Sequence, residues 1–164
     1  MKKYVGMILA AVLLTGCSAR ETFETIADDL VEPAAAVLRQ VELSLPLEAA
    51  VPVSETENGK LYLCDGYEIA LQTLPSGDLN ATVRSISGFS REDLTILEHT
   101  AGDYTRYDMV WTSAGEEGDR IGKAAVLDDG NYHYVLSILA DSQRVREYEG
   151  VWQEMLDSYA LLPY

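Results

Sequence analysis

Cysteine and basic side chains are scarce in this chain. Its 164 residues include two cysteines, and 12 lysines or arginines stand against 27 aspartates or glutamates, which gives a net charge of −15. Nucleic-acid binding needs a basic surface to neutralise phosphates, so the charge excludes that class. Two cysteines are too few for a disulfide-rich scaffold, and a chain of this length buries enough apolar surface without one. We therefore expect an acidic domain held together by an ordinary hydrophobic core.

The N-terminal apolar run is too short to cross a membrane. It covers residues 5–14 and has ten residues, whereas a membrane-spanning helix needs about 20. Lys2 and Lys3 precede the run, and small residues follow it. A positive start, a short apolar run and a small-residue cleavage point are typical of a secretory signal peptide.

The run ends in Leu14-Thr15-Gly16-Cys17, which resembles the lipobox of bacterial lipoproteins. In that family the leader is cut before the cysteine, and the cysteine carries diacylglyceryl and acyl groups. The resemblance implies a signal peptide over residues 1–16, lipidation of Cys17, and anchoring in the bilayer at the outer face of the cytoplasmic membrane or in the cell envelope. Two acyl chains anchor a protein stably, whereas one does so only marginally. An ordinary signal peptide, or a buried apolar helix with an incidental cysteine, stays open as the alternative.

No repeat or low-complexity tract divides the rest of the chain. Apolar residues at helical spacing predict a helix over residues 18–32, which Pro33 would end. We expect residues 17–40 to be a lipid-anchored helical segment and residues 41–164 to be a single α+β domain.

Alternating apolar and polar residues predict about six strands in the middle of the chain. They lie at residues 41–46, 61–64, 67–74, 104–113, 120–127 and 132–140. Asp65-Gly66 and Asp129-Gly130 predict tight hairpin turns, because these residue types tolerate positive φ. The last strand is apolar on both faces, so we expect it to be a central strand covered on both sides.

Two helices are expected within the domain. The first carries an apolar face over residues 79–86 and ends at Gly88, a residue typical of helix C-termini. The second is a long C-terminal helix over residues 141–161, with Asp141 or Ser142 as its N-cap. Its apolar stripe consists of Val145, Tyr148, Trp152, Met155 and Tyr159. Together these elements predict an α+β fold: an antiparallel sheet flanked by helices, with the C-terminal helix packed on the sheet.

The C-terminal half resembles the PsbP-like and DcrB-like exported domains. The resemblance rests on the run GDRIGKAAVLDDGNYHYVLSIL, residues 118–139, and on the later VWQEMLDSY, residues 151–159. It implies an antiparallel sheet with helices on its faces. It also implies an accessory role without a catalytic site.

Candidates for catalysis are His99, His133 and Cys64. A thiol beside an imidazole is the combination used in nucleophilic catalysis, yet no nucleophile motif surrounds these residues. We expect Cys64 to be a buried apolar residue and the protein not to be an enzyme. A small hydrolase that uses His99 or His133 stays open as an alternative.

An acidic loop at residues 116–119 offers Glu116, Glu117 and Asp119 as oxygen ligands. Hard cations such as Ca²⁺ take several such ligands, but the loop lacks the spacing of an EF-hand. A Ca²⁺-dependent protein is thus a second alternative, although we expect no metal or other cofactor.

Tyrosine is abundant, with ten residues. Large amphipathic rings suit both binding surfaces and half-buried strand positions. Candidates for a binding surface are Tyr107, Trp111, Tyr132 and Tyr134. The expected function is that of a membrane-anchored extracytoplasmic lipoprotein, acting as a non-catalytic accessory or ligand-binding domain. Its expected partners are the bilayer and a membrane or envelope protein.

Overall fold

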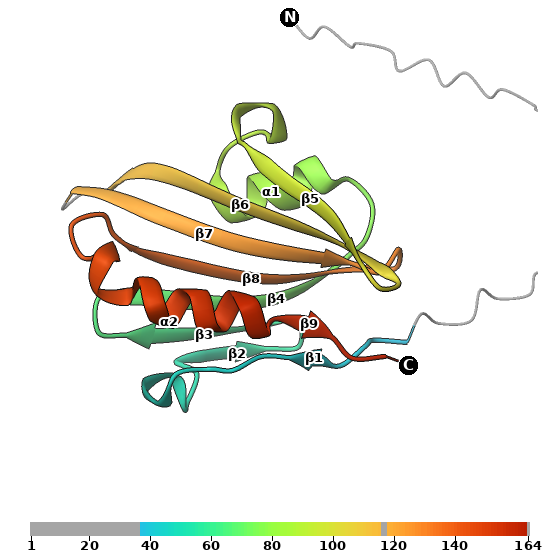
Figure 1. Ribbon diagram of the computed structural model, residues 1–164, viewed down its shortest axis with the longest axis horizontal. Helices are drawn as coiled ribbons and strands as arrows, with labels where there is room; N and C mark the ends of the chain where they lie inside the picture. The colour runs from blue at the N-terminus through green and yellow to red at the C-terminus, as the bar shows by residue number, and fades with distance from the viewer. Residues whose placement is uncertain (1–36, 116–117, 164) are drawn as a thin grey trace, which may run out of the picture. The chain divides into compact units, whose positions relative to one another are not determined.

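The computed structural model describes residues 37–115 and 118–163 (Figure 1). The signal peptide, Cys17, the predicted helix at 18–32, Glu116 and Glu117 lie outside the described residues. The described residues belong to one compact unit. Its fold is α+β, with a seven-stranded antiparallel sheet and a helix on each face, as the sequence predicts.

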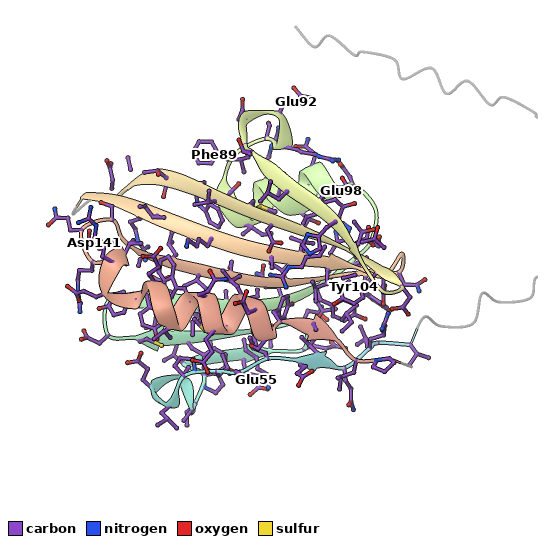
Figure 2. The ribbon with its side chains drawn as sticks, viewed as in Figure 1. Glu55, Phe89, Glu92, Glu98, Tyr104 and Asp141 are labelled. Atoms are coloured by element: carbon purple, nitrogen blue, oxygen red, sulfur yellow. The ribbon has the colours of Figure 1, made fainter. Side chains whose placement is uncertain are left out.

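The sheet has one more strand than expected, and its borders differ from the prediction. In sheet order the strands are β2 (Ser54–Thr56), β3 (Gly59–Cys64), β4 (Tyr67–Pro75), β8 (Tyr132–Asp141), β7 (Gly118–Asp128), β6 (Tyr104–Gly115) and β5 (Ile96–Ala101). The border strand β2 is polar and exposed, and β5 is mostly exposed and begins with two adjacent apolar residues, so neither shows the alternation of a half-buried strand. Glu55 and Glu98 mark these opposite borders in Figure 2.

The strand predicted at residues 41–46 is wrong in length and place. Only β1 (Val41–Glu42) is extended and paired, and its partner is β9 (Ala160–Leu161) in a separate two-stranded sheet. Leu43 and Leu45 turn inward and pack on the core instead. Because the partner lies at the far end of the chain, local alternation does not reveal it.

Both predicted hairpin turns are confirmed. Gly66 and Gly130 have φ of 86° and 88°, the left-handed region in which glycine has no steric penalty. In the second turn the Asp129 carboxylate accepts hydrogen bonds from the backbone N–H groups of Asn131 and Tyr132. These turns set the register of β3 on β4 and of β7 on β8.

β8 is the central strand, as its two apolar faces predict. Tyr134, Leu136 and Ile138 are buried on one face, and Val135 is buried on the other. The expectation of cover on both sides is therefore confirmed.

The first predicted helix is confirmed as α1 (Leu79–Ser87). The Asp78 side chain caps it by accepting a hydrogen bond from the backbone N–H of Asn80, and Gly88 ends it with φ of 80°. Leu79 and Val83 pack on the sheet against Met109, Trp111, Ala124, Val126 and Val135.

The C-terminal helix, α2 (Val145–Ser158), is shorter at both ends than the predicted range 141–161. Asp141 still belongs to β8, where it is the cross-strand neighbour of Arg120. Its carboxylate accepts a hydrogen bond from the backbone N–H of Gln143 in the turn that follows. At the other end Ala160 has left the helix for β9. The apolar stripe nevertheless points inward: Trp152 and Met155 are buried within the helix, and Tyr159 is buried just beyond its last turn.

The helices cover different parts of the sheet. In Figure 1, α2 lies in front of the sheet, where it contacts β8 and β7, whereas α1 lies behind β6 and β5. The β5–β6 border is therefore open on the face that carries α2. Leu97 and Val110 are exposed there.

Candidate binding groove

A groove of about 450 Å³ runs between α2 and the open border of the sheet. Its walls include Leu97 of β5, Val110 of β6, Lys123 of β7, and Gln153 and Leu156 of α2. Strand alternation explains the lining, because successive side chains point to opposite faces. Val110 and Lys123 are cross-strand partners on the open face.

Arg106 fixes the helix that forms one wall. Its guanidinium binds both carboxylate oxygens of Asp108 at 2.8–3.0 Å and donates to the backbone carbonyls of Leu156 and Tyr159, each at 2.9 Å. The last carbonyls of a helix have no partner within the helix. A basic side chain that satisfies them stabilises the helix end and complements its dipole. Arg106 therefore positions α2 beside the groove.

Lys123 brings a positive charge into the groove. Its Nζ lies 5.7 Å from the centre of the Trp152 ring, within the range of a cation–π contact. Within the described residues, this cation–π contact is the only interaction found for the Lys123 ammonium group, which forms no ion pair there. The groove thus combines the exposed aliphatic side chains of Leu97 and Val110 with two basic groups, Arg106 and Lys123, and two carboxylates, Asp108 and Asp157.

A hydroxyl, an imidazole and a carboxylate form a chain on the other face of the sheet. Thr82 Oγ1 and His133 Nδ1 are 2.8 Å apart, and His133 Nε2 is 3.5 Å from an Asp128 oxygen. Asp128 also accepts from the Ser76 hydroxyl at 3.0 Å. Thr82 and His133 are 5 % and 1 % exposed, so a substrate does not reach the hydroxyl. This chain of polar side chains holds α1 against β7 and β8 and so stabilises the fold.

The three residues considered for thiol chemistry do not meet. Cys64 is the cross-strand partner of Tyr67, and Tyr67 is the partner of Ala140 at one end of β8. His133 lies at the other end of β8, seven residues from Ala140. At about 3.3 Å per residue that separation is about 23 Å. His99 is exposed on the border strand β5, 3.8 Å from Asp108. Cys64 is half-buried rather than buried as expected. This partial burial, the largest cause, raises the pKa of the Cys64 thiol, so the reactive thiolate is disfavoured.

The predicted aromatic candidates are dispersed as well, and of the acidic candidates only Asp119 lies within the described residues. Asp119 is exposed, and no cluster of three or more His, Cys, Asp or Glu side chains suited to a metal occurs at residues 37–115 and 118–163. Trp111 and Tyr134 are buried core residues on opposite faces of the sheet. Tyr132 packs on Tyr134 with ring centres 6.2 Å apart. Tyr107 is half-buried under Arg91.

The sequence does not predict the groove, because its aromatic residues favour the opposite face of β6 as the binding surface. The aromatic side Tyr107, Met109, Trp111 is the side that α1 covers. The mixed side, with Arg106, Asp108 and Val110, is the one left accessible. The one sequence signal for the groove is Val110, an apolar residue on the same strand face as the charged Arg106 and Asp108.

The fold defines a class of α+β proteins with helices on both faces of an antiparallel sheet. No family model matches this chain, and no curated protein matches it in sequence. Among solved structures, it is similar to LpqN, which is involved in cell envelope biogenesis of Mycobacterium tuberculosis. The TM-score is 0.51 and the identity 11 %, over 77 % of this chain and 85 % of LpqN.

A second similar structure is the Ran-binding protein Mog1p of Saccharomyces cerevisiae, with a TM-score of 0.47 and 12 % identity over 74 % of this chain and 89 % of that one. The feature that this chain shares with LpqN is the fold. Neither helix in the described part of the chain is long and apolar enough to span a bilayer.

Proposed function

We propose that this chain is a lipid-anchored extracytoplasmic protein with a non-catalytic, accessory role. Diacylglyceryl and acyl groups on Cys17 tie it to the outer face of the cytoplasmic membrane or to the cell envelope. Its folded domain binds a membrane or envelope protein through the groove beside α2.

Two observations support the setting. The leader and Leu14-Thr15-Gly16-Cys17 have the order expected of a lipidation signal. The fold is shared with LpqN, a protein involved in cell envelope biogenesis. The proposal extends that setting to this chain.

The observation that carries the binding role is the open border of the sheet beside α2. Leu97 and Val110 are exposed there, and Val110 is the cross-strand partner of Lys123. An apolar patch next to charge is typical of a surface that binds a protein. The separation of Cys64 from His133 supports an accessory role over a thiol enzyme.

Cross-linking in intact membranes, followed by pull-down, tests the proposal. Wild type should incorporate labelled palmitate and cross-link to one specific protein. Cys17→Ala should lose the label and the membrane association. Val110→Asp should keep the label but lose the cross-linked partner, because it places a carboxylate on the apolar wall.

Leu63→Asp is the matched control, since Leu63 is an exposed apolar residue on β3, far from the groove. It should retain both the label and the partner. A wild-type protein without palmitate would refute the anchor. Equal capture by Val110→Asp and wild type would refute the groove as the binding surface.

A further inference from the structure

Exposed apolar side chains are concentrated in one short part of the domain. Of the ten large hydrophobic side chains exposed among the described residues, six lie within residues 37–53 and a seventh is Leu162. We call these seven the edge strip: Val37, Leu38, Val41, Leu47, Val51, Val53 and Leu162. Leu47 is 98 % exposed and Val51 76 % exposed. Single exposed apolar residues are ordinary, but a concentration of them marks an interaction surface.

The edge strip follows one border of the domain. The chain runs through β1, then through the short 3₁₀ turn Leu47–Ala49, and then into β2, the outermost strand of the sheet. In Figure 1 this part is the cyan to blue-green chain along the lower edge. Leu162 joins it because its backbone N–H donates to the Gln40 carbonyl at 2.9 Å.

Charge along the edge strip is low and partly turned inward. Residues 37–53 contain three charged side chains and no lysine. Arg39 is buried and pairs with Asp103 at 3.0 Å. Glu48 accepts a hydrogen bond from the Tyr67 hydroxyl. Nearby Glu55, on the same edge in Figure 2, pairs with Lys60 at 2.8 Å.

The position of the edge strip in the chain points to its partner. Val37 begins the described domain 20 residues after Cys17, so the proposed tether leads directly to the strip. Twenty extended residues span at most about 70 Å. The strip has no basic cluster to attract anionic headgroups, and the acidic chain is repelled by them. Insertion of its aliphatic side chains is the remaining source of attraction to a bilayer.

We propose that the edge strip lies on the lipid surface, with its aliphatic side chains inserted at the level of the headgroups and upper acyl chains. This inference rests on the proposed lipid anchor. It holds the domain with its lower border in Figure 1 toward the bilayer. The groove beside α2 lies toward the opposite border of the sheet, so a membrane-bound domain keeps it accessible.

A polarity-sensitive dye on the strip tests the inference. The full lipidated protein, with Cys64→Ser, carries the dye at Leu47→Cys and is reconstituted into phosphatidylcholine vesicles. The emission should shift to the blue, and brominated lipids should quench it at least twofold. The same dye at Leu97→Cys, an exposed site on the opposite border strand, should show neither change.

A second variant separates insertion from mere nearness. Leu47→Gln together with Val51→Gln leaves the tether intact and changes only exposed side chains, so folding should be unaffected. A dye at Val53→Cys should then lose its bromolipid quenching, whereas flotation with vesicles should persist. Unchanged quenching would overturn the inference.

The outcomes distinguish this inference from the proposed function. If wild type does not float with vesicles, or floats no more than Cys17→Ala, the tether is refuted and the inference falls with it. If the protein floats but Leu47→Cys responds like Leu97→Cys, the inference alone is overturned. A blue shift that disappears when the protein is diluted with excess lipid would assign the strip to a second copy of the chain.

Discussion

The two faces of the sheet are stabilised in different ways. On the α2 face, Trp152 and Met155 are completely buried and pack with Tyr67 and Tyr159, and the Tyr67 and Trp152 rings are 6.4 Å apart. On the α1 face, the core is smaller and contains the polar chain that includes His133. Apolar burial dominates the first face, whereas close fit and a hydrogen bond matter more on the second. Mutations should therefore act through different mechanisms on the two faces.

The largest effect is expected on the α2 face. Trp152→Ala removes a fully buried indole and should lower the free energy of unfolding by about 3–5 kcal/mol. Urea denaturation followed by circular dichroism measures it. Val83→Ala, the corresponding change on the α1 face, should cost less because it removes fewer buried atoms. An equal or greater loss for Val83→Ala would break the comparison.

A glycine on the α1 face should be the next most sensitive position. A Cβ atom on Gly122 would lie 2.2 Å from two carbons of the Trp111 ring. Gly122→Ala should therefore destabilise the protein toward the upper end of the about 1–3 kcal/mol typical of overpacking. Gly150→Ala is the matched control on α2, where nothing lies within 4 Å. It should raise stability by up to about 1 kcal/mol through helix propensity, so a loss in both variants would contradict this account.

The hydrogen bond between α1 and β8 should contribute less. Thr82→Val keeps the shape of the side chain but leaves His133 Nδ1 without its partner. The expected loss is toward the lower end of about 1–3 kcal/mol. Thr82→Ser retains the hydroxyl and should lose less. A double-mutant cycle with His133→Leu measures the coupling, and zero coupling would show that the bond does not stabilise the face.

The smallest and most gradual effect concerns pH. Burial, the largest cause, raises the pKa of Tyr67 and of Tyr159 on the α2 face above the ordinary value. In the unfolded chain a tyrosine titrates near 10. Above about pH 10 the unfolded chain therefore binds fewer protons than the folded one, and stability falls as pH rises. The urea midpoint should be lower at about pH 10.5 than at pH 8, and Tyr67→Phe should reduce that difference.

Much of the fold follows from local patterns. Asp-Gly turns and period-two alternation predict β3–β4 and β7–β8, and the apolar faces of β8 predict its central place. The end of α2 did not follow, because Tyr159 is buried whether or not it continues the helix. β1 did not follow either, since its partner β9 is more than 100 residues away. Such pairings depend on the assembled domain rather than on neighbouring residues.

The groove was harder to predict than the fold. Alternation separates the two faces of β6 but does not tell which face a helix will cover. The aromatic face is the one that the sequence favours for binding, although α1 buries Trp111. The sequence does not indicate a role for Lys123, because its place beside Trp152 depends on how α2 crosses β7.

Arg39 connects the first described residues to distant parts of the domain. Its guanidinium donates to the Leu162 carbonyl at 3.1 and 2.8 Å and to Asp103, and its backbone N–H donates to the Tyr134 hydroxyl. Arg39 and the β1–β9 pair therefore fasten the first described residues to the last strand and to the central strand β8. A force applied from the N-terminal side would act on these few hydrogen bonds before it acts on the longer strand pairs of the seven-stranded sheet.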